Sequence, residues 1–239
     1  DEAADALDAL MAQNGVASYL MRDKQIATTV KLRVVARNQQ LIRLDFEEHP
    51  NREVLEQIKQ KYREVLPEYD AIIFSDYGKG GLSHISDMID WAKHAGKTVL
   101  IDPKGDDYEK YAGATLITPN RAELKEVVGS WKNESELTEK AQNLRRHLDL
   151  TAVLLTRSEE GMTLFSEGEP IYQPTRAQEV YDVSGAGDTV IAGVGLGLAA
   201  GYTMPEAMHL ANTAAGVVVA KLGTAVCSFT ELNKALEEQ

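Results

Sequence analysis

The chain has 239 residues, of which 44% are hydrophobic and 26% are charged, and a formal net charge of −12. This length fits one α/β domain with a substantial core, and the acidic balance argues against nucleic acid and anionic membranes as partners. There is no run of eighteen apolar residues and no signal-peptide pattern, and the single Cys227 excludes an internal disulfide, so we expect a cytoplasmic protein. The five histidines lack metal-ligand spacing, which argues against a zinc site.

The first residues predict a helix followed by a strand. In 2–14, apolar residues recur at helical spacing until Gly15, and 16–20 then has the composition of a strand. An alternating α/β fold normally opens on a central strand rather than on a helix. We therefore expect further residues before Asp1 in the parent protein.

Two β-rich runs follow, at 28–35 and 41–46, in which apolar and polar residues alternate. We predict an antiparallel hairpin, a small β lid over 26–48, ahead of the main sheet. Between Arg22 and Arg43 there are six basic residues and one acid, against the balance of the whole chain. This pattern fits either arginines that grip a small anion or a solvated strand face whose charges protect an edge.

From residue 50 onward, strand and helix patterns alternate regularly. This alternation predicts a mostly parallel, doubly wound sheet covered by helices on both faces. The predicted strands are 70–74, 98–101, 114–117 and 152–155, followed by a hairpin of 162–165 with 170–172. The predicted helices are 51–65, 83–96, 121–128, 134–147, 190–200, 203–221 and 228–238.

Polar residues follow each predicted strand of this region. They are Asp76, Asp102, Lys104, Asn120, Glu123 and Thr156. Singly, each fits an ordinary cap or turn. Ligands of open α/β sheets bind beyond the carboxyl ends of the strands, so together these residues favour a metal–triphosphate site.

A glycine-rich turn at 181–189 connects a predicted strand end, 179–181, to a helix of small and apolar residues. Gly185 and Gly187 allow a sharp turn that leaves N–H groups at a helix N-terminus, which suits a phosphoryl oxygen. Asp188 beside this seat could accept the proton of a nucleophile that attacks the anion. The ordinary alternative is a glycine turn followed by a helix-start acid.

The pattern Asp-x-x-Gly-Ala-Gly-Asp-Thr at 182–189 resembles the signature of the ribokinase-like (PfkB) carbohydrate kinases. This resemblance implies that Asp188 is the catalytic base and that the amides of Gly185, Ala186 and Gly187 hold the transferring phosphoryl group.

Further segments resemble one subfamily, the heptose-7-phosphate kinase domains of ADP-heptose synthases. These segments are 29–48, 75–80, 102–105, 118–120, 156–159 and 216–224. The likeness covers nearly the whole chain and implies one ribokinase-like domain over 1–239. Two parts of the subfamily pattern do not occur: an opening strand with a sugar-binding glycine segment, and the adenylyltransferase domain of the fused forms.

The resemblance also implies ATP and Mg²⁺ as cofactors, with a monovalent cation such as K⁺ in some relatives. Asn120, Arg121, Ala122 and Glu123 match the family's Asn-x-x-Glu motif along the nucleotide phosphates, with Glu123 organising the hydration shell of Mg²⁺. Other ATP-side positions are Thr156, Asn212, Lys221 and Gly223, and Asp182 matches a position that binds a monovalent cation. Ser158 stands where the family often has glycine.

The subfamily transfers phosphate from ATP to the anomeric hydroxyl of D-glycero-β-D-manno-heptose 7-phosphate, on the way to ADP-heptose for lipopolysaccharide. The basic hairpin would then hold the 7-phosphate. Its candidate residues are Lys31, Arg33, Arg37 and Arg43, with Lys79 as a second candidate and Asp76 for the sugar hydroxyls. Because a lid hairpin of this family often pairs with its twin, we expect a homodimer.

Three other interpretations stay open. A related kinase for another sugar phosphate or a nucleoside is the nearest, although the basic lid argues against an uncharged nucleoside. A dinucleotide-dependent oxidoreductase would use Gly193–Gly197, but this run lies inside a predicted helix, which favours close helix packing. A non-catalytic relative is disfavoured because Asp188 and Glu123 are both present.

Overall fold

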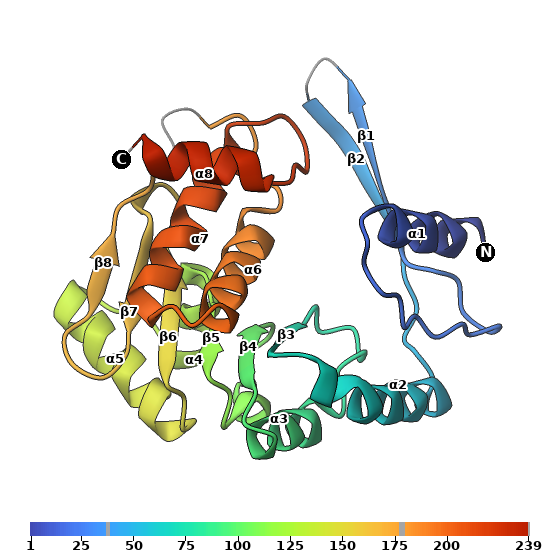
Figure 1. The fold of residues 1–239 in the computed structure, drawn as a ribbon, viewed down its shortest axis with the longest axis horizontal. Helices are drawn as coiled ribbons and strands as arrows, with labels where there is room; N and C mark the ends of the chain where they lie inside the picture. Colours follow the sequence, from blue (N-terminus) through green and yellow to red (C-terminus); the bar gives the residue numbers. More distant parts are fainter. Residues whose placement is uncertain (37–38, 177–179, 239) are drawn as a thin grey trace. The chain divides into compact units, whose positions relative to one another are not determined.

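The computed structural model describes residues 1–36, 39–176 and 180–238 (Figure 1). The chain divides into two compact units. Unit 1 contains Asp1–Val65 and Gly78–His84, and unit 2 contains Leu66–Tyr77 and Ile85–Gln239.

Unit 1 combines helices with a two-stranded hairpin. Its elements are α1 (Glu2–Gln13), β1 (Val30–Ala36), β2 (Gln39–Phe46) and α2 (Arg52–Val65). Asp1 caps α1, since its carboxylate accepts a hydrogen bond from the N–H of Ala4 at 2.9 Å. Asn51 caps α2 in the same way, with its side-chain oxygen 2.9 Å from the N–H of Val54.

The predicted strand over 16–20 is wrong, because this described segment forms no strand. Side chains of this segment and of Arg22 just after it bind helix α1 instead. The Ser18 hydroxyl donates to Asp8 at 2.9 Å, and the Arg22 guanidinium lies 3.0 Å from Asp5 and 2.6 Å from Asp8. The β-type composition was present, but a strand also needs a neighbouring strand with which to pair.

The hairpin of β1 and β2 is antiparallel and has two different faces. Val30 lies opposite Phe46, Leu32 opposite Leu44 and Val34 opposite Ile42, so one face is apolar. The other face carries Lys31 opposite Asp45 and Arg33 opposite Arg43. The register shifts between Val34 and Val35, which marks a local irregularity near the turn.

Unit 2 is built on a six-stranded sheet in which the strands follow their sequence order. The strands are β3 (Ala71–Ser75), β4 (Thr98–Asp102), β5 (Leu116–Ile117), β6 (Ala152–Thr156), β7 (Met162–Phe165) and β8 (Ile171–Gln173). β3 to β6 pair in parallel, whereas β7 and β8 are antiparallel additions at the edge. The predicted mostly parallel sheet is therefore confirmed.

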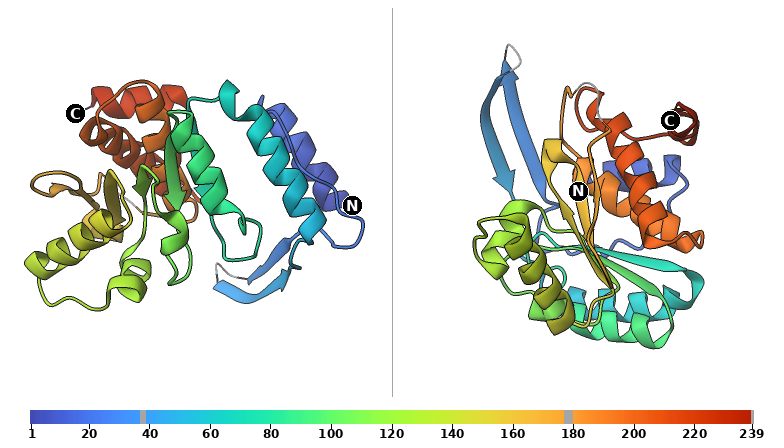
Figure 2. Two further views of the ribbon diagram at one scale, coloured as in Figure 1. Left: turned by 90° about the horizontal axis from the view of Figure 1, so that it is seen from below. Right: turned by 90° about the vertical axis from the view of Figure 1, so that its left-hand side faces the viewer.

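Helices cover both faces of this sheet, as the two views of Figure 2 show. One face carries α3 (Ile85–His94), α4 (Arg121–Val128) and α5 (Glu134–His147), and the other carries α6 (Ala186–Ala199) and α7 (Met204–Val219). Helix α8 (Phe229–Glu237) packs on α7. None of the helices in the described ranges is long and apolar enough to cross a membrane.

The core between the sheet and helices α6 and α7 follows the strand period. Leu100, Leu116 and Leu154, on neighbouring strands, form one buried cluster with Val194 and Ala211 of the helices. Because side chains alternate along a strand, the intervening buried residues face α3, α4 and α5. These intervening residues are Val99, Ile101, Ile117, Val153 and Leu155.

Helices α6 and α7 pack closely where glycines of α6 meet alanines of α7. A Cβ added at Gly193 would lie 2.9 Å from the Cα of Ala211, and one added at Gly197 would lie 2.9 Å from the Cβ of Ala207. These separations are shorter than real contacts, so only glycine fits there. The helix-packing interpretation of Gly193–Gly197 is therefore confirmed.

The segment before α6 is not the strand end that the sequence predicted. Residue 179 lies outside the described residues, and 180–181 form no strand. The N–H groups of Tyr181 and Asp182 instead donate to the carbonyl oxygen of Val219 at 2.8 and 3.3 Å. The segment is thereby fixed to the C-terminal end of α7.

Candidate active site

Four carboxylates gather at the carboxyl edge of the sheet in unit 2. Asp76 follows β3, Asp102 ends β4, Glu123 lies in the first turn of α4 and Asp188 in the first turn of α6. The pKa of the Asp102 carboxyl is raised to about 6, mainly by burial and then by the charges of Glu123 and Asp188. Asp76 raises this pKa slightly, whereas Lys104 lowers it. The four acids therefore share one electrostatic environment, as the sequence predicted for this edge.

The turn before Asp188 is open and shaped by glycine. Gly185 caps α6 with φ +80° and ψ 3°, a left-handed conformation that glycine adopts without strain. Nothing lies within 4 Å of a Cβ added at Gly187, so a ligand can approach the backbone there. The N–H of Ala186 donates to Val183 at 3.2 Å, so among the three predicted amides those of Gly185 and Gly187 are better placed to receive an anion.

Asp182 shapes the same turn. Its carboxylate accepts a hydrogen bond from the N–H of Ser184 at 2.8 Å, which fixes the chain just before Gly185. Thr189 completes the turn, because its hydroxyl donates to the carbonyl oxygen of Gly185 at 2.8 Å.

The Asn-x-x-Glu segment forms a capping box at the start of α4. The Asn120 side chain accepts hydrogen bonds from the N–H groups of Ala122 at 2.9 Å and Glu123 at 3.0 Å. In return, Glu123 Oε2 accepts the N–H of Asn120 at 3.0 Å. Glu123 Oε1 lies 3.1 Å from the Nζ of Lys104. The motif thus fixes a carboxylate at the sheet edge.

Asp76 is buried in a network that the sequence did not reveal. Its Oδ2 accepts hydrogen bonds from the Tyr111 hydroxyl at 2.7 Å and the Lys110 ammonium at 2.8 Å. Burial raises the pKa of the Tyr111 hydroxyl, so Tyr111 stays protonated and can donate. The same hydroxyl accepts the backbone N–H of Lys104 at 3.0 Å. Tyr111 therefore connects Asp76 to the segment after β4.

Two predicted ATP-side residues lie close to the α4 start. The N–H of Thr156, at the end of β6, donates to the Pro119 carbonyl at 3.0 Å, and Thr156 forms an isolated parallel bridge with Asn120. The Arg121 guanidinium forms an ion pair with Glu160. These contacts bring the ends of β5 and β6 together.

The remaining ATP-side candidates lie on the C-terminal helices and the loop between them. Asn212 is buried in α7, and its Nδ2 donates to the carbonyl of Pro174 at 2.8 Å, as expected for an interior polar residue. Lys221 Nζ lies 2.6 Å from Glu231 and 2.8 Å from the Val226 carbonyl, so it braces the loop that contains Gly223. This loop approaches the glycine turn, since a Cβ added at Gly185 would lie 3.5 Å from Thr224.

The predicted substrate residues belong to unit 1, except Asp76. Lys31 and Arg33 are exposed on the charged face of the hairpin, with Arg43 opposite Arg33. Arg37 lies outside the described residues. Lys79 Nζ lies 2.5 Å from Glu47, and Lys79 lines a hollow of about 960 Å³ within unit 1.

The donors at the sheet edge fit Mg²⁺ better than a softer metal. Within the described ranges, no group of three or more His, Cys, Asp or Glu side chains could enclose a metal ion by itself. Mg²⁺ needs no such cage, because it keeps several waters and takes one or two carboxylates together with nucleotide phosphates. Glu123 and Asp102 offer carboxylates of this kind at the sheet edge.

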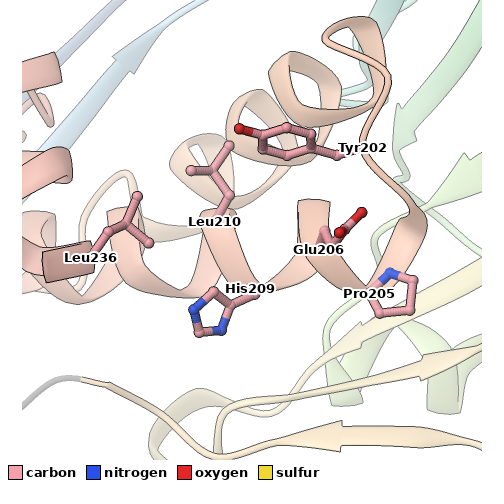
Figure 3. A pocket seen from close by; sticks show the side chains of 6 residues that line it. All are labelled: Tyr202, Pro205, Glu206, His209, Leu210 and Leu236. Atoms are coloured by element: carbon pink, nitrogen blue, oxygen red, sulfur yellow. The ribbon is translucent and has the colours of Figure 1, made fainter. Parts of the chain in front are cut away.

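A separate hollow of about 400 Å³ lies at the other end of α6 (Figure 3). Its lining residues are Tyr202, Pro205, Glu206, His209, Leu210 and Leu236. Helix α6 has 14 residues, so the hollow is about 20 Å from the glycine turn. It is not part of the carboxylate site.

Comparison with known proteins identifies the class. The pfkB family of carbohydrate kinases matches residues 1–231. The chain belongs to this family.

Two curated relatives are similar over almost the whole chain. The "Bifunctional protein HldE" of Chromohalobacter salexigens is 52% identical over 237 residues, which are 99% of this chain and 50% of that protein. The "D-beta-D-heptose 7-phosphate kinase" of Bordetella bronchiseptica is 48% identical over 97% of this chain and 74% of its own length. The chain thus spans about half the length of the bifunctional relatives.

Solved structures agree on the ribokinase-like fold. Ribokinase from Thermotoga maritima has a TM-score of 0.82 at 20% identity, and covers 99% of this chain and 78% of its own. Phosphofructokinase-2 from Escherichia coli, in complex with potassium, has a TM-score of 0.80 at 19% identity, with 98% and 78% coverage. At these identities the likeness concerns the fold alone.

Proposed function

We propose that the chain is an ATP-dependent kinase that phosphorylates the anomeric hydroxyl of D-glycero-β-D-manno-heptose 7-phosphate to give the 1,7-bisphosphate. The observation that carries this proposal is the 48% identity, over 97% of the chain, to a protein named "D-beta-D-heptose 7-phosphate kinase". The carboxylates and the open glycine turn support it, because they suit phosphoryl transfer. We assign residues 1–239 to one kinase domain whose lid is the hairpin region 26–48.

The proposed reaction is a direct, in-line transfer. Asp188 accepts the proton of the sugar hydroxyl as that oxygen bonds to the γ-phosphorus of ATP and the bond to the β–γ bridging oxygen breaks, which releases ADP. The amides of Gly185 and Gly187 donate to the oxygens of the transferring group. Mg²⁺, when bound, neutralises phosphate charge, and Glu123 is its candidate protein partner. Asp182 is our candidate for a nearby monovalent cation such as K⁺.

We assign the 7-phosphate to the charged face of the hairpin. Arg33 and Arg43 lie directly opposite each other, and the Nε of Arg43 lies 3.2 Å from the Asp45 carboxylate. A phosphate between the two guanidiniums would accept hydrogen bonds from both of them. Lys31 lies two residues from Arg33 and so shares this face.

We further propose that the hairpin's apolar face packs against a second copy of the chain. The side chains of Val30, Leu32, Val34, Ile42, Leu44 and Phe46 are between 39% and 57% exposed. Such a continuous apolar face is unusual on a monomer. A relative, phosphofructokinase-2 of Escherichia coli, has a tetrameric form.

The direct test is ADP release from ATP and Mg²⁺ with four acceptors: heptose 7-phosphate, fructose 6-phosphate, ribose and adenosine. Turnover with heptose 7-phosphate alone, lost in Asp188→Asn, is the expected result. Turnover with a different acceptor would keep the kinase and refute the heptose assignment. Release of ADP that persists in Asp188→Asn would refute the assignment of Asp188 as the base.

A further inference from the structure

Lys104 is a cation at the carboxylate edge to which the proposed reaction assigns no role, although the sequence placed it among the residues that follow the strands. Its ammonium lies 3.1 Å from Glu123 Oε1, and its side chain is 53% exposed, while that of Glu123 is 13% exposed. Two other basic side chains of this region already form ion pairs with carboxylates. Lys110 pairs with buried Asp76 at 2.8 Å, and Arg121 pairs with Glu160.

The backbone of Lys104 is fixed although its side chain reaches into solvent. The buried Tyr111 hydroxyl accepts the Lys104 N–H at 3.0 Å and donates to Asp76 at 2.7 Å. Asp76 is itself held by its N–H, which donates to the Asp102 carbonyl at 2.9 Å. A lysine with a fixed backbone and a long, exposed side chain can change its partner at small cost in the protein.

The present partner of Lys104 is the carboxylate expected to face Mg²⁺. Glu123 Oε2 is occupied by the N–H of Asn120, so Oε1, where Lys104 sits, is the oxygen left for a second partner. An ammonium and a divalent cation at one carboxylate oxygen repel each other strongly. Occupation of Glu123 by one therefore disfavours the other.

We propose that Lys104 exchanges partners, neutralising Glu123 in the free protein and binding the nucleotide phosphates when a divalent cation is at Glu123. The proposal rests on the proposed kinase function. It gives Lys104 a direct contact with ATP and makes Tyr111 the positioning residue behind it. The segment after β4 is then a phosphate-binding segment as well as a strand end.

Calorimetric titration of the whole protein with ATP, without any sugar, tests the exchange. Glu123→Gln is the informative variant, because glutamine keeps the capping box but releases Lys104. We expect this variant to bind Mg²⁺-free ATP about tenfold more tightly than the wild type, since a charged hydrogen bond is gained. The double variant Lys104→Met with Glu123→Gln should lose that gain, and Lys104→Met alone should bind Mg²⁺–ATP about tenfold more weakly.

The matched control is Lys93→Met. Lys93 is also a half-exposed lysine in an ion pair, 2.7 Å from Asp149, and it should leave every ATP affinity unchanged. A gain in Glu123→Gln that survives Lys104→Met would show a simple loss of negative charge and overturn the exchange. Unchanged Mg²⁺–ATP affinity in Lys104→Met would overturn it too. Failure to phosphorylate heptose 7-phosphate would sink the proposed function but would not alter these affinities.

Discussion

Charged residues cluster both on the hairpin of unit 1 and at the sheet edge of unit 2, but the elements that carry them differ in how deeply they are buried. On the hairpin, Arg33 and Arg43 are exposed, and so are the other residues of the two strands whose side chains the structure describes. At the sheet edge, Asp102 ends β4 and Glu123 lies in the first turn of α4, and both elements contribute fully buried side chains. An adaptable surface is enough to hold a phosphate that does not react, whereas proton transfer requires groups fixed within a fraction of an ångström.

The largest effect should come from the sheet edge. Asp188→Asn should lower kcat by about a thousandfold with little change in KM, since it removes the proposed general base but leaves the binding groups. Steady-state kinetics with heptose 7-phosphate would measure this. Asp149→Asn, which alters an exposed carboxylate paired with Lys93, is the control and should leave kcat unchanged. Equal losses in both variants would contradict the role of Asp188.

Two leucine substitutions, one in the sheet and one on the hairpin, test this difference in burial. Leu116→Ala in β5 should destabilise the protein by about 3 kcal/mol, because Leu116 is 0% exposed and its loss leaves a cavity. Leu44→Ala on the hairpin should lower the free energy of unfolding by less than about 1 kcal/mol. Urea denaturation measures both. Similar losses would mean that the hairpin face is as well packed as the core.

The pKa of Asp102 predicts a pH dependence of stability. Its folded value of about 6 lies above the ordinary 3.8, so the folded state holds the proton more tightly than the unfolded state. Its contribution to stability is therefore full below pH 3.8 and is lost as the pH rises through 6. Asp102→Asn should be more stable than the wild type at pH 7.5, by at most about 3 kcal/mol, with the difference vanishing near pH 3.5. Denaturation at both pH values checks the sign.

The smallest effect should come from the hairpin. Arg33→Ala and Arg43→Ala should each raise the KM for heptose 7-phosphate about tenfold while kcat changes little, since the phosphate that we assign to these arginines does not react. Arg146→Ala, an exposed arginine of α5, is the control. An unchanged KM in both hairpin variants would remove the phosphate assignment from this face.

Local sequence signals predicted much of the fold, and tertiary contacts account for the rest. Helix α4 begins and ends as predicted because Asn120 caps one end and Gly129 follows the other. The strand expected at 16–20 did not form, and neither did the described part, 180–181, of the strand end expected at 179–181, because β-type composition does not report a pairing partner.

The sequence likewise predicted one part of the candidate site and not the other. The polar residues after each strand predicted the acidic edge, since parallel strands share it. The contact between Lys104 and Glu123 and the role of Tyr111 could not be predicted in this way. Tyr111 reaches Asp76 across 35 residues of sequence, and only the folded chain brings the two together.

The glycine-lined contact between α6 and α7 has a mechanical consequence. A Cβ at Gly197 would lie 2.9 Å from Ala207, so the two helices meet with no clearance and α6 cannot slide or tilt by itself. The contact with α7 thereby helps to fix the position of Asp188 in the first turn of α6. One methyl group at Gly197 would be felt about 14 Å away, nine residues along the helix, at the oxygen atoms of Asp188.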